Sequence, residues 1–318
     1  MRRQSSPVAE VSATCAQLLA ALCALGALLA HGGRVNRRLD LLTHFAPLYI
    51  LGAGLAVLIV IIARRQVRPT LVLAAIALVG AAALIAPEFL RSTGPRASAG
   101  APDQIKIIQF NVGRSNRDLP HVVDWLVAEN PDVVTLNESS ASVRDAIVRR
   151  TGWHVSGGMG DLMIFTPRER SRMDRLAGYA MVVTWVNATY LSSSGPFEVL
   201  TAHLRWPNGP EIPVQEKTLS ILMAALPADR TILTGDLNST PWSFNRQRDD
   251  RTLGLIRRDR AVATWPTWSP VALLPIDHIY AGPGWATVKV ERGPNLGSDH
   301  YPLIVTLAPV SRPPAAPH

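Results

Sequence analysis

Three long apolar segments before residue 102 constrain the fold of this chain most strongly. Residues 11–30, 45–63 and 70–90 carry almost no charge, and each approaches the ~20 residues with which a helix crosses a ~30 Å hydrocarbon core. Three successive helices without a polar face are atypical of a soluble core. Met1-Arg2-Arg3 before the first apolar run also fits a signal peptide, but the two runs that follow favour a retained helix. We predict a membrane anchor over residues 1–90 with three transmembrane helices.

The positive charge of the chain is concentrated in this anchor. Ten arginines and three acidic residues precede Gly100, which gives that part a net charge of +7 out of a total of +8. Arginines that flank apolar segments orient membrane spans. The remainder of the chain carries only +1, so its composition does not indicate a broad polyanion-binding face.

The orientation of the anchor is less constrained, because the two sides carry equal numbers of arginines. Residues 64–68 form a tight, charge-dense loop of the kind that is least readily translocated. We therefore expect the N-terminus inside and the region after the third span outside the cytoplasm, at the cytoplasmic (inner) membrane.

The chain after the anchor changes character. Residues 91–103 are rich in Gly, Ser, Ala and Pro and predict a linker, residues 104–310 predict one folded domain, and the proline-rich residues 311–318 predict a disordered tail. Within the domain, patterning predicts helices over 119–129, 143–150 and 214–226. It predicts strands over 105–110, 132–136, 181–190, 197–203, 231–234, 276–280, 286–290 and 303–307, and a hairpin over 153–166 that turns at Gly157-Gly158. Many strands with few, separated helices favour a layered α/β sandwich.

Polar side chains gather at the ends of these predicted strands, where a sheet-based enzyme builds its site. Taken singly, each is more often a turn former, a cap or a structural histidine. Together they lack a nucleophilic serine elbow or cysteine, and the set suits metal-assisted attack of water on phosphorus. The residues are Asn111, Glu138, His203, Asp236, Asn238, Asp277, His278, Asp299 and His300.

Six short segments resemble the endonuclease/exonuclease/phosphatase (DNase I-like) superfamily, and they occur in that superfamily's order. They are residues 107–112 (IIQFNV), 131–138 (PDVVTLNE), 201–204 (TAHL), 235–241 (GDLNSTP), 275–279 (PIDHI) and 297–302 (GSDHYP). The resemblance implies a four-layer α/β sandwich, in which two packed mixed sheets are flanked by helices, preceded here by the three transmembrane helices.

The same resemblance implies a role for each matching residue. Glu138 is expected to be the principal ligand of Mg²⁺ or Mn²⁺, with Asn111 helping to hold metal or phosphate and Asp299 as an additional acidic group. Asp236 is expected to orient or deprotonate the attacking water, beside Asn238. His300, oriented by Asp277, is expected to contact the phosphoryl oxygen or transfer a proton, and His203 to serve as the leaving-group acid.

Two positions depart from the superfamily's pattern. Gly113 stands where some members carry Asp, which places more of the metal binding on Glu138 and Asp299, and Asn137 stands where Gln is common. Neither change removes an expected catalytic group. A degenerate domain that only binds phosphorylated ligands, as an envelope sensor or scaffold, is the non-enzyme alternative.

The substrate is not decided by such a resemblance. The short linker and the tryptophans near the matching segments favour a lipid-linked phosphate or pyrophosphate at the membrane, although each tryptophan alone equally fits a core position. The tryptophans are Trp206, Trp242, Trp265 and Trp268. The anchored arrangement also resembles a membrane-anchored bacterial subgroup associated with the cell envelope. A membrane-tethered nuclease is the alternative enzyme, weakened by the few lysines after residue 100.

Overall fold

The structure, a computed structural model, describes residues 7–157, 161–168, 179–180 and 183–310. Contacts divide the chain into two compact units. The first comprises residues 1–91 together with Thr240–Arg248, and the second comprises Ser92–Ser239 and residues 249–318. The tail over 311–318, the first two residues of the strand predicted over 181–190 and Gly158 of the predicted turn lie outside the described residues.

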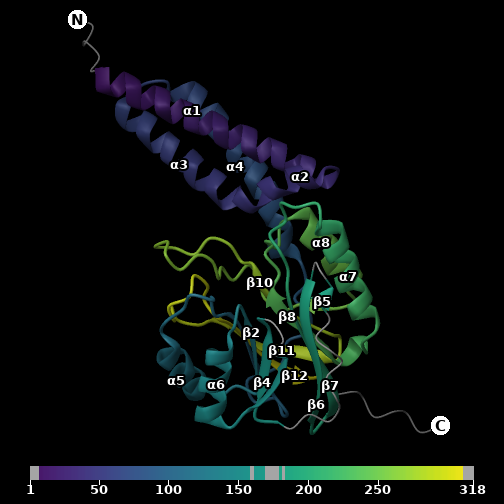
Figure 1. Cartoon of the computed structure of the whole chain (residues 1–318). Helices are drawn as coiled ribbons and strands as arrows, with labels where there is room; N and C mark the ends of the chain where they lie inside the picture. Colours follow the sequence, from purple (N-terminus) through teal and green to yellow (C-terminus); the bar gives the residue numbers. More distant parts are fainter. Residues whose placement is uncertain (1–6, 158–160, 169–178, 181–182, 311–318) are drawn as a thin grey trace, which may run out of the picture. The chain divides into compact units, whose positions relative to one another are not determined.

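The first unit is built on three apolar helices, α1 (Pro7–Ala30), α3 (Ala46–Ala63) and α4 (Val67–Leu90) (Figure 1). All three are long and apolar enough to cross a membrane. Each of them begins or ends within a few residues of its predicted bounds. Between α1 and α3 the chain forms short helical turns, η1 (His31–Arg34), α2 (Arg37–Asp40) and η2 (Leu41–Phe45).

Small side chains line the contacts between these helices. The buried positions of α1 are six alanines and Cys23, and the Cα of Gly80 in α4 approaches Ala27 so closely that an added Cβ would lie 3.2 Å from the Ala27 methyl. Leucines point outward instead: Leu18, Leu22 and Leu25 are 54–67% exposed. Small residues inside and large apolar residues outside are the pattern of a helix bundle in lipid.

The second unit contains two six-stranded mixed sheets. The first has the strand order β11-β12-β1-β2-β4-β3 and the second the order β5-β6-β7-β8-β10-β9. In the first sheet the strands are β1 (Ile105–Asn111), β2 (Val133–Asn137), β3 (His154–Gly157), β4 (Met163–Thr166), β11 (Trp285–Arg292) and β12 (Leu303–Pro309). In the second they are β5 (Tyr179–Ala180), β6 (Val183–Ser192), β7 (Gly195–His203), β8 (Thr231–Asp236), β9 (Ile256–Arg257) and β10 (Asp277–Ala281).

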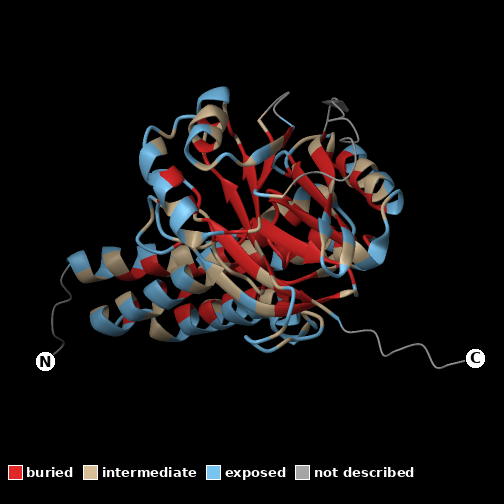
Figure 2. Ribbon diagram, turned by 90° about the horizontal axis from the view of Figure 1, so that it is seen from below, coloured by how far each residue is buried: buried red, intermediate tan, exposed pale blue. Residues whose placement is uncertain are grey.

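The sheets pack face to face and helices cover their outer faces. Apolar side chains of β1, β2 and β4 meet those of β6, β7 and β8 in one buried cluster, visible as the red centre of the domain in Figure 2. A second cluster joins the first sheet to α5 (Leu119–Glu129) and α6 (Ala141–Thr151). A third joins the second sheet to α7 (Ile212–Ala224). The expected four-layer α/β sandwich is therefore confirmed.

Two segments behave differently from their predictions. The predicted linker is partly paired with the domain, because Ala97 donates to the Thr287 carbonyl and Thr287 donates to that of Pro95. A helix that the sequence pattern did not indicate, α8 (Phe244–Thr252), follows β8. Its segment Phe244-Asn-Arg-Gln-Arg-Asp-Asp-Arg-Thr is almost wholly polar, so it lacks the apolar periodicity by which a helix is recognised.

Candidate active site

The strand ends carry the predicted site residues to one place in the second unit. β1 and β2 are parallel neighbours in the first sheet, as β7 and β8 are in the second. Asn111 ends β1, Glu138 follows β2, and His203 and Asp236 pair in register at the ends of β7 and β8. Asp277 opens β10, which runs antiparallel to β8, and it pairs with Asp236 from the other side.

Local backbone geometry explains how β8 reaches this position. Gly235 has a φ of +152°, and a Cβ placed there would lie 1.9 Å from the Ala202 carbonyl oxygen of β7. Only glycine permits this approach immediately before Asp236. Glu138 and Asn238, with φ of 50° and 48°, adopt left-handed conformations that are uncommon for side chains other than glycine. Such conformations cluster at functional sites, where surrounding structure enforces them.

Asn111 links the two sheets at the floor of the site. Its Nδ2 donates to Asp236 Oδ2 at 3.0 Å and to Glu138 Oε1 at 3.2 Å. Its Oδ1 accepts the backbone N–H of Gly113 at 3.1 Å. The amide nitrogen therefore faces the carboxylates, and its two N–H groups orient the oxygens of Asp236 and Glu138.

Asp236 is the central group, buried to 1% exposure. Burial raises its pKa, and the charge of Asp277 raises it further against the opposing effects of His300 and His203. Its backbone N–H donates to Asn137 Oδ1 at 3.0 Å, while Asp236 Oδ1 accepts the N–H of Asn238. Asn137, the residue that departs from the superfamily pattern, is thus a buried hydrogen-bonding partner of the β8 end.

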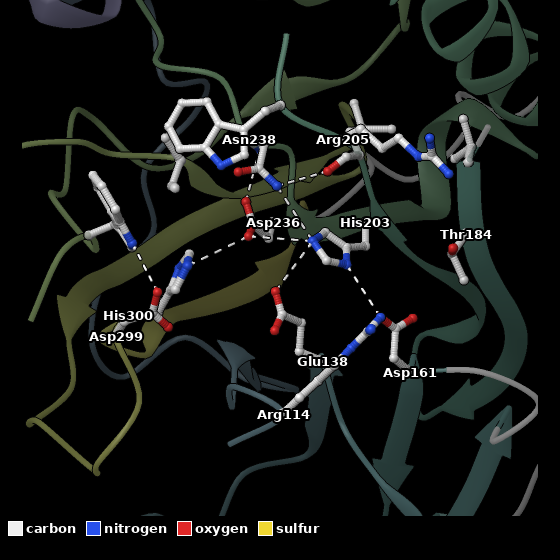
Figure 3. A pocket seen from close by; sticks show the side chains of 15 residues that line it. Arg114, Glu138, Asp161, Thr184, His203, Arg205, Asp236, Asn238, Asp299 and His300 are labelled. Carbon is white, nitrogen blue, oxygen red and sulfur yellow. Dashed lines mark hydrogen bonds and ion pairs between the residues drawn. The ribbon is translucent and has the colours of Figure 1, made fainter. Parts of the chain in front are cut away.

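One histidine on each side faces Asp236. His300 Nε2 and His203 Nε2 each lie 3.7 Å from Asp236 Oδ2 (Figure 3). His300 Nδ1 is hydrogen-bonded to Asp277 Oδ2 at 2.8 Å. Burial alone lowers the pKa of His300, but Asp277 and Asp236 outweigh it and raise this pKa to about 10.

The second histidine has a looser partner that the sequence pattern did not reveal. His203 Nδ1 lies 3.6 Å from Asp161 Oδ2, and Arg114 donates to the same oxygen at 2.6 Å. Burial lowers the pKa of His203, whereas Asp161, Asp236 and Glu138 raise it, with a net upward shift. In return, the nearby His203 ring holds the pKa of Asp161 well below its usual range, with Arg114 adding to the effect.

These side chains surround an open cavity of about 460 Å³. Its floor is formed by Glu138, Asp236 and the two histidines, as Figure 3 shows. Asp299 lies exposed at the rim, where its Oδ2 accepts the indole N–H of Trp265 at 3.1 Å. The cavity is also lined by Arg114, Asp161, Val183, Thr184, Leu204, Arg205, Trp206, Asn238, Trp265 and Ile276.

The charges around the cavity fit a divalent cation. Asp236, Asp277 and His300 form a buried group that could hold a metal ion, with donor atoms within 4.8 Å of one another. Asp277 is hydrogen-bonded to His300 Nδ1 and does not line the cavity, whereas Asp236 lines it beside the carboxylates of Glu138 and Asp299. Carboxylate oxygens are the ligands preferred by Mg²⁺. Burial of several carboxylates together also favours a cation that offsets their repulsion.

One tryptophan of the predicted set belongs elsewhere. Trp242 is 3% exposed and donates its indole N–H to the Thr43 carbonyl within the first unit. It is therefore unavailable to a substrate. The other three follow one another, with ring centroids 6.0 Å apart from Trp206 to Trp265 and again from Trp265 to Trp268.

Comparisons with known proteins place this geometry in context. The sequence profile described as Endonuclease/Exonuclease/phosphatase family matches residues 108–300. Among curated proteins, none matches the chain. Among solved structures, the human Nocturnin catalytic domain with bound sulfate is 16% identical, with a TM-score of 0.54, over 70% of this chain and 98% of that one. A mannosyl-6-phosphatase from Bacteroides thetaiotaomicron VPI-5482 is 14% identical, with a TM-score of 0.53, over 64% and 99%. Humanized TDP2 from D. rerio is 16% identical, with a TM-score of 0.53, over 64% and 99%.

Proposed function

Because the chain belongs to the endonuclease/exonuclease/phosphatase family, we propose that it is a metal-dependent phosphoesterase that hydrolyses a lipid-linked phosphate or pyrophosphate at a membrane surface. The observation that carries this proposal is the combination of a charged catalytic floor and an aromatic rim in one cavity. The floor suits a phosphoryl group, and the rim suits the apolar part of a lipid.

The groups on the floor divide the chemical work. Glu138 is the proposed principal ligand for Mg²⁺ or Mn²⁺, with Asp299 as an additional acidic group. When bound, the cation neutralises charge on the phosphoryl oxygens. Asp236 orients and deprotonates the attacking water, and Asn111 orients the Asp236 and Glu138 carboxylates through its two N–H groups. Asn238 donates a hydrogen bond to a phosphate oxygen, and the two histidines contact the phosphoryl group and the leaving group.

The rim of the cavity supports a lipid substrate. Trp206 and Trp265 line the cavity, and Trp268 beyond them is 74% exposed. An exposed tryptophan combines an apolar ring with a polar N–H and suits the boundary between water and apolar lipid. Val271, 65% exposed on the same loop, adds apolar surface.

The anchor supports the same substrate class. Three helices with outward leucines suit a lipid bilayer, which is the proposed immediate partner of the chain. The domain is joined to them by a short stretch, because Thr93 already accepts a hydrogen bond from Arg258 of the domain. The resemblance to a membrane-anchored bacterial subgroup supports a place in the cell envelope, with the domain outside the cytoplasm as the proposed orientation.

The test is a substrate panel with the full-length protein in vesicles and Mg²⁺ or Mn²⁺. Polyprenyl diphosphate, phospholipid and plasmid DNA are supplied separately, and Asp236→Asn is the matched inactive control. We expect release of phosphate or headgroup from a lipid substrate that stops on addition of EDTA. Plasmid cleavage without lipid hydrolysis would instead assign the chain as a membrane-tethered nuclease.

A further pair of variants tests the rim. Trp268→Ala should raise KM for the vesicle substrate several-fold and leave kcat unchanged, because the ring contacts lipid and not the reacting atoms. Leu191→Ala, at a 54% exposed apolar position on β6, is the control and should leave KM unchanged. Equal effects of the two substitutions on KM would show that Trp268 at the rim does not contact the lipid substrate.

A further inference from the structure

The segment directly after the catalytic turn is held by the membrane anchor. The turn Asp236–Ser239 belongs to the phosphoesterase unit, whereas Thr240–Arg248 packs as part of the anchor unit. The covalent bond between Ser239 and Thr240 therefore joins the catalytic turn to a segment whose position is set by the anchor.

Asp40, between α1 and α3, makes the principal contacts to this segment. Its Oδ1 accepts the backbone N–H of Phe244 and its Oδ2 accepts that of Asn245, both at 2.8 Å. These are the first two residues of α8, so one carboxylate satisfies two N–H groups that a helix start leaves without an intrahelical partner. A negative charge at this end is also favoured by the helix dipole. Asp40 is 2% exposed.

Two neighbours of Asp40 form hydrogen bonds to residues that lie closer to the catalytic turn. His44, 1% exposed, accepts the N–H of Thr240 at 3.2 Å through Nδ1, and the Thr240 hydroxyl lies 2.8 Å from the same atom. The carbonyl of Thr43 accepts the indole N–H of Trp242 at 2.9 Å. These contacts begin one residue after Ser239.

Within the phosphoesterase unit, a separate histidine fixes the other side of that peptide bond. His278 Nε2 lies 2.9 Å from the Ser239 carbonyl, and its Nδ1 lies 2.9 Å from Asp259 Oδ2. Both histidine and aspartate are fully buried. The end of the catalytic turn is thus fixed by His278 and Asp259 at Ser239, and by His44 and Asp40 from Thr240 onward.

Three membrane crossings by α1, α3 and α4 are consistent with the contacts of Asp40 and His44. A chain that crosses three times places the connection between α1 and α3 on the same side as everything after α4. Asp40 and His44 belong to that connection, so they can reach the segment after β8 without crossing the bilayer.

We propose that Asp40 is a positioning residue for hydrolysis: by holding the start of α8 it fixes the downstream end of the turn that carries Asp236 and Asn238. Turnover then depends on the anchor as part of the enzyme and not only as a tether. This inference goes beyond the proposed substrate, because it holds for any phosphoester that reaches the cavity.

The test compares full-length Asp40→Ala and Asp40→Asn in vesicles with wild type, using bis(p-nitrophenyl) phosphate with Mg²⁺ as the probe. Loss of a helix-capping carboxylate shifts a local equilibrium by about tenfold. We expect Asp40→Ala to lower kcat by about this factor with little change in KM. Asp40→Asn, which keeps one acceptor oxygen, should recover part of the loss.

Hydrogen exchange supplies a readout that needs no turnover. In Asp40→Ala, amides from Leu237 to Arg248 should exchange faster than in wild type, while those of β1 should not change. Thr14→Ala is the matched control, because it removes hydrogen bonds of the anchor to Glu10 and Gln66 that do not involve Thr240–Arg248. It should alter neither kcat nor exchange over residues 237–248.

A second variant keeps the proposal testable if Asp40→Ala does not fold. Trp242→Phe keeps an aromatic ring but removes the hydrogen bond to Thr43, and it should produce smaller changes in the same direction. Unchanged exchange over residues 237–248 in Asp40→Ala and Trp242→Phe would overturn the proposal. Faster exchange with unchanged kcat would also overturn it, because the contact would then be structural only.

Discussion

The two histidine–aspartate pairs on either side of Asp236 differ in closeness and burial. His300 and Asp277 are joined by a 2.8 Å hydrogen bond, and their side chains are 6% and 0% exposed. His203 and Asp161 are 3.6 Å apart, and their side chains are 17% and 14% exposed. The tight pair keeps His300 charged through neutral pH, whereas the looser pair leaves His203 freer to exchange a proton. The difference favours His300 for binding the phosphoryl group and His203 for protonating the leaving group.

The largest effect is expected at Asp236, the residue that both histidines face. Asp236→Asn should lower kcat by a thousandfold or more, on the order of the loss when a base and a charged partner are removed together. Phosphate release at saturating substrate measures it. Retention of a tenth of the activity would show that the two histidine–aspartate pairs act without Asp236, which would contradict its central role.

Substitution of His300 should have the second largest effect, and the size of the activity loss should not depend on pH between 6 and 9. With a pKa of about 10 it is protonated up to about pH 9, so His300→Gln should lose activity about a hundredfold at every pH from 6 to 9.

Asp277→Asn tests the cause of that raised pKa. Removing the Asp277 charge lowers the pKa of His300, so activity should fall as pH rises through the new, lower value. A pH–rate profile measures the new alkaline limb. A profile of unchanged shape would contradict the role given to the tight pair.

His203 should show a smaller effect that depends on the leaving group. His203→Gln should slow hydrolysis of an alkyl phosphodiester by about thirtyfold, because the departing alkoxide needs a proton. It should slow a p-nitrophenyl ester only slightly, because that leaving group departs without one. Equal losses on both esters would assign leaving-group protonation to another group.

The smallest effect is expected from the partner of His203. Asp161 raises the pKa of His203, so Asp161→Asn should lower this pKa. If His203 acts as an acid, the alkaline limb of the pH–rate profile then moves to lower pH, with only a few-fold loss at the optimum. The control is Thr184→Ala, because Thr184 lines the same cavity. Replacing the neighbouring Leu162 would disturb packing instead, because that side chain is 1% exposed. An alkaline limb at the same pH as in wild type would show that Asp161 does not set the pKa of His203.

The sequence predicted most of this arrangement because the information lies locally at strand ends. Asn111, Glu138, His203 and Asp236 each follow a run of apolar, β-forming residues, and parallel pairing brings these ends together. The helix over Leu119–Glu129 has the predicted bounds because its apolar spacing is regular.

Asp161 and Asp40 were missed for the opposite reason. Asp161 precedes the apolar run Leu162–Phe165, a weak signal, and it reaches the site only because β4 pairs with β2. Asp40 caps a helix that begins about 200 residues later in the chain, so neither α8 nor its cap is recognisable from local sequence. Roles that arise from long-range contacts leave no periodic pattern to detect.

Surface dilution tests whether the bilayer presents the substrate to the enzyme. Full-length protein is reconstituted in vesicles with Mg²⁺, and polyprenyl diphosphate is held at one bulk concentration while its mole fraction in the membrane is lowered with inert phospholipid. We expect the rate of phosphate release to fall with the mole fraction of polyprenyl diphosphate in the membrane. A rate that follows the bulk concentration alone, or plasmid cleavage faster than lipid hydrolysis in the same vesicles, would contradict it.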